Sequence, residues 1–238
     1  MTNKILVAID GPAGSGKSTV AKQLAEKLQI PYLDTGAMYR AVTYVAVTTN
    51  VELTNESAIA ELSKIIKIDF KKNEKGLEQV IANGIDVTHE IRTPELTNQV
   101  HHIASNSGVR ENMVAMQRVL GKKYGGVVEG RDIGTVVFPD TPYKFYLDGD
   151  ISIRVERRAA ELNARGVSVK IEDLTTEQER RDARDKNRKI SPLKQADDAI
   201  LVDTSKLTIS EVVGTIAQLI SDIMGSNNGT KSPIGRKK

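Results

Sequence analysis

A glycine-rich segment near the start of the chain constrains the fold more than any other feature. Residues Gly11 to Ser18 match the pattern G-x-x-x-x-G-K-[ST]. The segment follows an apolar run, 5–9, and precedes a stretch, 20–28, whose apolar residues recur at helical spacing. A strand, a glycine-rich turn and a helix form the context in which this pattern binds phosphate. The sequence therefore predicts a phosphate-binding loop between a first strand and a first helix.

Each residue type in this loop suits the binding of a nucleoside triphosphate. Glycines allow successive backbone N–H groups to point at one anion, and the start of the following helix adds partial positive charge. Lys17 is expected to neutralise the outer phosphates, and the Ser18 hydroxyl to ligate Mg²⁺. The predicted ATP-binding residues are Gly11, Pro12, Ala13, Gly14, Ser15, Gly16, Lys17, Ser18 and Thr19.

Composition excludes several other kinds of site. The chain of 238 residues contains no cysteine, so disulfides, thiolate metal sites and cysteine nucleophiles are ruled out. No run of apolar residues approaches the length of a membrane span. We therefore expect a cytoplasmic protein that does not bind a membrane.

The basic character of the chain comes from its last residues. The formal net charge is +3, but residues 225–238 contain four basic residues and no acid, so the rest of the chain is slightly acidic. This segment is polar and has no periodicity, which predicts a disordered basic tail. Nucleic acid is therefore not expected as a partner, although the tail leaves a weak RNA-binding site open.

Strand-like and helix-like stretches alternate along most of the chain. This alternation predicts an α/β fold with three layers and a doubly wound, mostly parallel sheet of about five strands. The exception is 66–87, where two alternating runs are followed by Asn83-Gly84, the strongest short signal for a hairpin. Thr93 and Pro94 then predict the start of another helix. We expect a small antiparallel sheet inserted into the main fold.

Charged residues lie near the carboxyl ends of two of the predicted strands, Arg40 on the first turns of the helix that follows its strand. Arg40 comes after the strand 30–33, and Arg131 and Asp132 come after the strand 126–129. Ligands of open α/β sheets bind at the carboxyl ends of the strands, so these side chains are candidates for a binding site. A surface arginine and an ion pair within a turn remain the simpler interpretations.

An arginine-rich region, 151–198, contains two sets of residues at helical spacing. Arg154 and Arg158 share one helical face, and Arg181, Asp185 and Arg188 share another. A solvated face of compensating ion pairs would explain them. A mobile flap that carries positive charge to a transferring phosphoryl group and excludes water would also explain them.

Among proteins with a phosphate-binding loop, a small-molecule kinase fits best. A regulatory GTPase should contain Asn-Lys-x-Asp, which is absent from the sequence. A motor or nucleic-acid ATPase would need an extended second acidic motif and a longer chain. A kinase needs an acceptor pocket beside the loop and a closing flap, which the charged segments could supply.

Four segments resemble those of the bacterial cytidylate kinases: 11–19, 34–40 (DTGAMYR), 130–139 (GRDIGTVVFP) and 191–199 (SPLKQADDA). The similarity covers about residues 3 to 223 in the same order. It implies transfer of the γ-phosphoryl group of ATP to CMP or dCMP, with Mg²⁺. It also implies a P-loop kinase fold whose inserted antiparallel subdomain binds the nucleoside monophosphate.

The resemblance also implies roles for individual residues. The implied CMP-binding residues are Arg40, Arg131 and Arg188 for the phosphate, Arg110 and Asp132 for cytosine, Arg181 and Asp185 for the ribose, and also Thr35 and His101. The implied catalytic residues are Lys17, Arg131, Arg158 and Arg188, with flap arginines among Arg154, Arg157 and Arg158. His101 departs from the family, which commonly has a serine there, so the fine selectivity for the base depends on what an imidazole can donate or accept.

The resemblance implies one P-loop kinase domain over 1–224, with a core of 1–64 and 104–224. The inserted subdomain is expected over about 65–103, a short lid over about 152–173, and the basic tail over 225–238. A monomer is expected. The alternatives are a kinase of UMP, AMP or another small metabolite, and a nucleotide-binding regulator whose tail binds RNA.

Overall fold

The main sheet organises the molecule. The computed structural model describes residues 4–72, 74, 78–164 and 166–228. The five strands lie in the order β2-β6-β1-β7-β8, and every neighbouring pair is parallel. The strands are β1 (Leu6–Asp10), β2 (Tyr32–Asp34), β6 (Gly126–Gly130), β7 (Tyr143–Asp148) and β8 (Ile200–Asp203). The predicted five-stranded α/β sheet is therefore confirmed.

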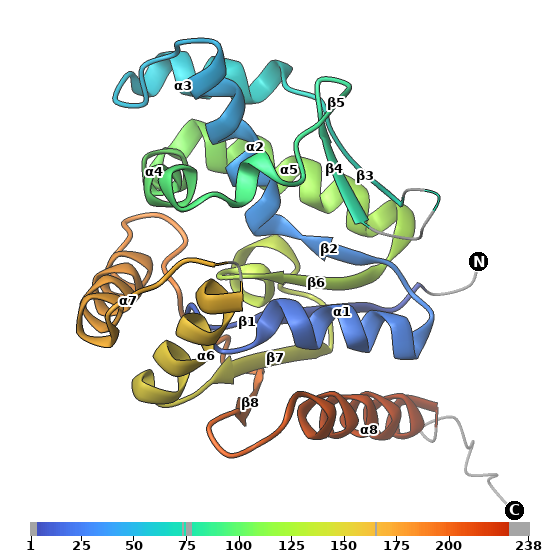
Figure 1. Ribbon diagram of the computed structural model, residues 1–238. Coiled ribbons are helices and arrows are strands. Elements are labelled where there is room, and N and C mark those ends of the chain that lie inside the picture. Colours follow the sequence, from blue (N-terminus) through green and yellow to red (C-terminus); the bar gives the residue numbers. More distant parts are fainter. Residues whose placement is uncertain (1–3, 73, 75–77, 165, 229–238) are drawn as a thin grey trace, which may run out of the picture.

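Helices cover both faces of this sheet (Figure 1). The described helices of the whole fold are α1 (Lys17–Leu28), α2 (Thr35–Thr48), α3 (Glu56–Ile65), α4 (Pro94–Ser105), α5 (Ser107–Tyr124), α6 (Ile151–Ala164), α7 (Ile171–Lys186) and α8 (Ile209–Asn228), with a 3₁₀ turn η1 (Glu90–Arg92) and a π turn η2 (Ile133–Val137).

Alternation along β1 divides the interior into two apolar layers. Val7 and Ile9 pack in a cluster with residues of α1 and α8, which we call the main core. Ala8, between them, packs on the other face with residues of α5 and η2. Successive side chains of a strand point to opposite faces, so one short apolar run supplies both layers.

A second, antiparallel sheet lies apart from the first (Figure 1). It contains β3 (Ile68–Lys72), β4 (Glu78–Ala82) and β5 (Ile85–Asp86). Asn83 and Gly84 connect β4 to β5 with positive φ angles of 50° and 86°, the conformation expected of an Asn-Gly hairpin. The predicted inserted sheet and its turn are therefore confirmed.

The small sheet shares its hydrophobic core with helices on both sides of it in the sequence. This small-sheet core contains residues of α2, α3, β3, β4, η1, α4 and α5, among them Met38, Ile59, Val80, Ile103 and Met113. The packing unit is therefore wider than the predicted insertion of 65–103.

The last helix is longer than predicted. Helix α8 continues to Asn228, so the first four residues assigned to a disordered tail, 225–228, are helical. The remaining tail residues, 229–238, lie outside the described residues. Among the described helices, none is both long and apolar enough to cross a membrane.

Candidate active site

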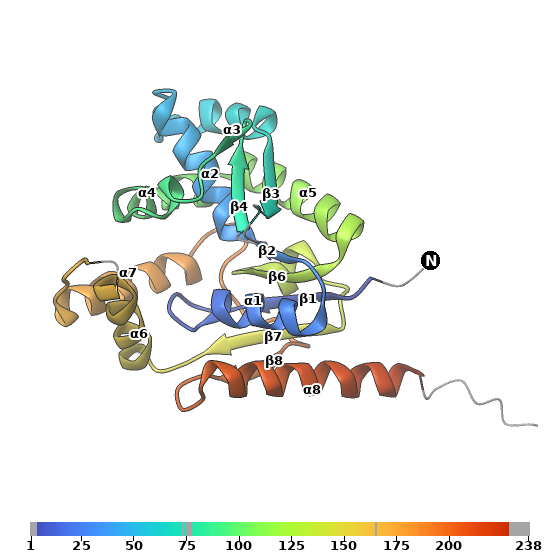
Figure 2. The same ribbon diagram turned by 45° about the vertical axis from the view of Figure 1, so that its right-hand side comes forward.

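A cavity of about 410 Å³ lies at the carboxyl ends of the parallel strands. In Figure 2, the end of α1 that follows the phosphate-binding loop lies at these strand ends, and the helices α6 and α7 lie beyond them. The predicted site residues that line the cavity are Ala13, Gly14, Gly16, Lys17, Ser18, Thr19, Thr35, Arg40, Arg110, Arg131, Asp132, Arg158, Arg181, Asp185 and Arg188. Cationic side chains outnumber carboxylates in this lining, so the cavity suits anionic ligands.

The phosphate-binding loop turns back on itself between β1 and α1. Gly14 and Gly16 have φ angles of 74° and 85°, which side chains rarely allow. The amides of the first turn of α1 therefore face the cavity. Gly11, Pro12 and Ser15 do not line the cavity and instead support the loop from behind: the buried Ser15 hydroxyl donates to the Pro12 carbonyl at 3.1 Å.

Lys17 is held inside this loop. Its side chain is only 5% exposed, and Nζ donates to the Pro12 carbonyl at 2.5 Å and to Ser15 Oγ at 3.3 Å. Burial, and then the positive charge of Arg131, lower the pKa of Lys17. A bound anion would relieve both effects, so this lysine is suited to a polyphosphate.

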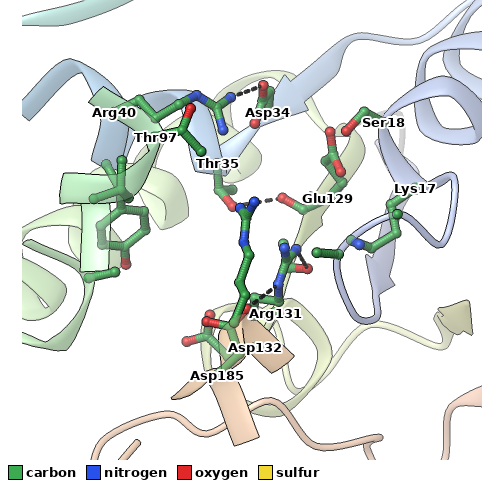
Figure 3. Close-up of a pocket in the computed structure, with 18 of the residues that line it drawn as sticks. Lys17, Ser18, Asp34, Thr35, Arg40, Thr97, Glu129, Arg131, Asp132 and Asp185 are labelled. Atoms are coloured by element: carbon green, nitrogen blue, oxygen red, sulfur yellow. Dashed lines mark hydrogen bonds and ion pairs between the residues drawn. The ribbon is translucent and has the colours of Figure 1, made fainter. Parts of the chain in front are cut away.

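Ser18 and Glu129 place oxygen atoms together at the edge of the loop (Figure 3). Glu129 is the last residue but one of β6 and accepts a hydrogen bond from the Tyr32 hydroxyl at 2.7 Å. Burial raises the pKa of Glu129, the charge of Asp34 raises it further, and Lys17 opposes both. A hydroxyl and a carboxylate suit Mg²⁺, which prefers oxygen ligands and is usually held by few protein groups together with phosphates and water. In the described residues no three His, Cys, Asp or Glu side chains form a metal site of their own.

The junction of β2 and α2 presents arginines to the cavity. Asp34 caps α2 by accepting from the Ala37 amide at 2.9 Å, and its other oxygen accepts from Arg40 Nη2 at 2.7 Å. Arg92 Nη2 lies 3.7 Å from the same oxygen. Thr35 Oγ1 donates to the Glu129 carbonyl at 2.7 Å, which ties α2 to the neighbouring strand. Asp34, Arg92 and Glu129 line the cavity but were not predicted as site residues.

A buried ion pair lies in the cavity wall. Arg110 on α5 is 2% exposed and Asp132 is 5% exposed, and Arg110 Nη2 donates to Asp132 Oδ2. The Tyr39 ring lies 5.4 Å from the Arg110 guanidinium carbon. Within the described part of the chain, Nε of Arg110 and Nε of Arg188 are buried without a hydrogen-bond partner. Buried donors are usually satisfied, so both point to a polar ligand.

Asp10, at the end of β1, fixes the backbone next to this pair. One carboxylate oxygen accepts from the Ile133 amide at 2.8 Å and the other from the Gly134 amide at 2.7 Å. These amides open the π turn η2, directly after Asp132. Burial raises the pKa of Asp10 to about 6, against the opposing effect of the two hydrogen bonds. Asp10 therefore positions the segment that carries Asp132.

Helix α7 supplies charges opposite the loop. Arg131 Nε donates to Asp185 Oδ2 at 2.9 Å (Figure 3). Burial, and then the charge of Arg131, lower the pKa of Arg181 to about 10. Arg188 follows the end of α7, and its Nη2 donates to the Ser191 carbonyl at 2.7 Å. The charged residues predicted on α7 therefore do contact the segment after β6, through Asp185 and Arg131.

The three predicted flap arginines of α6 lie in three different environments. Arg158 lines the cavity and pairs with Glu161 at 3.0 Å. Arg157 does not line it and donates to the Thr204 carbonyl at 2.5 Å. Arg154 is buried and donates to the Ala13 carbonyl at 2.8 Å. Of the three, only Arg158 is placed to meet a ligand.

His101 is the one predicted CMP-binding residue that the structure does not bring into the cavity. Residues of α4 that do line it are Thr97, Val100 and Ala104. The His101 ring is exposed, its Nδ1 is hydrogen-bonded to the Asn98 carbonyl at 2.8 Å, and it lies against the ring of His102. The helical position of His101 is beside the lining face, but its side chain turns back along the helix.

Comparison with known proteins identifies the family. A sequence model described as cytidylate kinase matches residues 7–222. A cytidylate kinase of Bacillus velezensis is 48% identical over 220 residues, which cover 92% of this chain and 98% of that protein. A cytidylate kinase of Desulforamulus reducens is 49% identical over 216 residues, which cover 91% of this chain and 96% of that protein. In fold, the chain is similar to an uncharacterized protein of Eubacterium ventriosum, with a TM-score of 0.51 at 15% identity over 92% of this chain and 99% of that chain. The chain therefore belongs to the cytidylate kinase family.

Proposed function

We propose that the protein transfers the γ-phosphoryl group of ATP to CMP or dCMP, which gives CDP or dCDP and ADP. Membership of the cytidylate kinase family supports this reaction. The observation that carries the choice of acceptor is the buried pair of Arg110 and Asp132 in the cavity wall. Cytosine has an amino donor at C4 and acceptors at N3 and O2. A carboxylate beside a guanidinium matches that edge, whereas uracil would present its O4 acceptor to the carboxylate.

In this proposal the two substrates occupy opposite sides of the cavity. The loop of Gly11 to Thr19 binds the ATP phosphates, with Lys17 neutralising the outer ones. The acceptor-phosphate ligands are Arg40, Arg131 and Arg188. Arg181 and Asp185 bind the ribose, and Thr35 contributes from the start of α2. That Arg110, Asp132 and Arg188 line the same cavity as the loop supports an acceptor in this position.

Catalysis in this proposal consists of positioning and charge stabilisation. The attacking CMP phosphate oxygen is already ionised at neutral pH, so no strong general base is required. Lys17, Arg131, Arg158 and Arg188 offset the charge that builds on the transferring group. Mg²⁺, held by Ser18 beside Glu129, would supply further positive charge to the ATP phosphates. Residues of about 152–173 act as a lid that removes competing water.

The same proposal covers the organisation of the chain. The chain forms one kinase domain over 1–224, which consists of a core of 1–64 and 104–224 and an insertion over about 65–103. The protein acts as a monomer in the cytoplasm. The absence of cysteine supports a reducing compartment.

A panel of nucleoside monophosphates tests the acceptor directly. CMP, dCMP, UMP, AMP and GMP are each assayed with ATP and Mg²⁺, and ADP release is measured. We expect CMP and dCMP to be the best acceptors. Lys17→Ala, which removes the loop cation, should abolish turnover while circular dichroism and the unfolding transition stay close to wild type. A clear preference for UMP or AMP, or full activity of Lys17→Ala, would overturn the proposal.

A further inference from the structure

Three buried side chains of helices α6 and α7 bind the backbone of a single residue in the phosphate-binding loop. Arg154 Nη1 on α6 donates to the Ala13 carbonyl at 2.8 Å, and Gln178 Nε2 on α7 donates to it at 2.9 Å. The Ala13 amide donates to Asp182 Oδ1 on α7 at 3.3 Å. Both polar groups of the Ala13 backbone are therefore held by α6 and α7.

These three side chains also hold one another in place. Arg154 Nη1 donates to Asp182 Oδ2 at 2.6 Å. The exposed fractions are 7% for Arg154, 5% for Gln178 and 7% for Asp182. A buried ion pair of this kind is weak evidence for stability, because apolar side chains of similar volume often stabilise as well. The need to hold the loop and the two helices in fixed positions explains this ion pair better than a contribution to stability.

Gly14, the residue after Ala13, packs tightly against both helices. A Cβ atom added to Gly14 would lie 2.6 Å from Gln178 Nε2 and 2.9 Å from the Arg154 carbonyl oxygen. A movement of the loop backbone must therefore displace the helices, and a movement of the helices must displace the loop.

Helix α7 connects this contact to the acceptor side of the cavity. Gln178 and Asp182 are four residues apart and bind the loop, and Gln178 also lines the cavity next to the loop; Arg181 and Asp185 are four residues apart and line the cavity further along. Residues four apart lie on one face of a helix, so Gln178 and Asp182 form the face of α7 toward the loop, and Arg181 and Asp185 form an adjacent face toward the acceptor side. A rotation or shift of α7 would change both at once.

We propose that Arg154, Gln178 and Asp182 form a latch that couples ATP binding at the loop to CMP binding through α7. The three are positioning residues: they act on the substrates through Ala13 and through the orientation of α7. Because such coupling is reciprocal, each substrate tightens the binding of the other by the same factor. This inference rests on the proposed function only in its choice of acceptor.

Equilibrium binding separates this role from a structural one. Titration calorimetry measures the affinity of a non-hydrolysable ATP analogue with and without saturating CMP, and of CMP with and without the analogue. We expect the wild type to show a coupling of about 5-fold or more. Asp182→Asn places an amide where a carboxylate accepts two hydrogen bonds, and should reduce the coupling to within about 2-fold of independent binding. The affinity for CMP alone should stay near wild type.

Two further variants complete the test. Gln178→Met removes the side-chain amide, and with it the donor to the Ala13 carbonyl, and nearly conserves volume, so it remains informative if Asp182→Asn fails to fold. Because Gln178 also lines the cavity, the variant is judged by the coupling factor and not by either affinity alone. Arg157→Met is the matched control, because Arg157 lies on the same helix and binds the Thr204 carbonyl instead of the loop. It should keep the wild-type coupling. Independent binding in the wild type, full coupling in Gln178→Met, or equal loss in Arg157→Met would overturn the latch. The titrations measure binding, and they use the acceptor that the monophosphate panel selects. A wrong choice of acceptor therefore shows in the panel, whereas a wrong latch shows in the coupling.

Discussion

Replacing Asp132 by alanine tests the recognition of the base most sharply. Asp132 is the carboxylate partner of Arg110, and both side chains are almost fully buried. Loss of a hydrogen bond between the base and a charged group costs roughly 1.5–3 kcal/mol. We therefore expect kcat/KM for CMP to fall by about 10- to 150-fold. The KM for ATP should change by less than about 2-fold, because the carboxylate is not part of the phosphate-binding loop.

The same substitution should also destabilise the fold. Removing one partner of a buried ion pair leaves the other charge uncompensated and costs about 3–5 kcal/mol. Water in the adjacent cavity can solvate Arg110 in part, so we expect the lower end, about 3 kcal/mol of unfolding free energy. Urea unfolding measures this loss, and kinetics with CMP and ATP varied separately measure the effect on each substrate.

A double variant separates stability from recognition. Arg110→Met with Asp132→Leu replaces the pair by apolar side chains of similar volume, which is often neutral or stabilising. We expect it to recover most of the unfolding free energy while the use of CMP stays impaired. Equal losses for ATP and CMP in Asp132→Ala, or recovered CMP kinetics in the double variant, would refute the assignment of this pair to the base.

Two further predictions concern Asp10 and His101. The pKa of Asp10 is raised from 3.8 to about 6 by burial, so its contribution to stability is fully present below pH 3.8 and is lost as the pH rises through 6. From pH 4 to 7 the wild type should therefore lose about 2.4 kcal/mol of unfolding free energy relative to Asp10→Asn; a constant difference in urea unfolding would contradict this. His101→Ser should leave kcat/KM for CMP within about 2-fold of wild type, because the ring lies outside the cavity. A change above tenfold in steady-state kinetics would show that α4 moves the ring to the base.

Local signals in the sequence were sufficient for much of the fold. The hairpin at Asn83 and Gly84 depends on two residues that accept positive φ, and the structure has both there. Thr93 caps α4, its side chain accepting from the Leu96 amide, as the Thr-Pro sequence predicted. The end of α8 was missed, because the polar residues after Met224 have no periodicity and were assigned to the tail, whereas the helix continues to Asn228.

The sequence predicted most arginines of the candidate site but fewer of its carboxylates. Arg40 and Arg131 follow strand ends, and the rule that ligands bind there placed them correctly in the cavity. Asp34 is the last residue of β2 and Glu129 the last but one of β6, so the same rule would have found them. His101 could not be settled in this way, because spacing gives the face of a helix but not the direction of a side chain that bonds to its own backbone.

The division of apolar packing into a main core and a small-sheet core has a consequence for how this enzyme can diversify. Helix α1, which begins with Lys17, belongs to the main core, whereas α2 and α5, which carry Arg40 and Arg110, belong to the small-sheet core. The cavity therefore lies between the two cores, which α5 connects because its Val114 packs with Ala8 of the main sheet. Substitutions that repack the small-sheet core act first on the helices that carry Arg40 and Arg110, and only through the main sheet on the phosphate-binding loop, so acceptor preference is open to evolution and engineering.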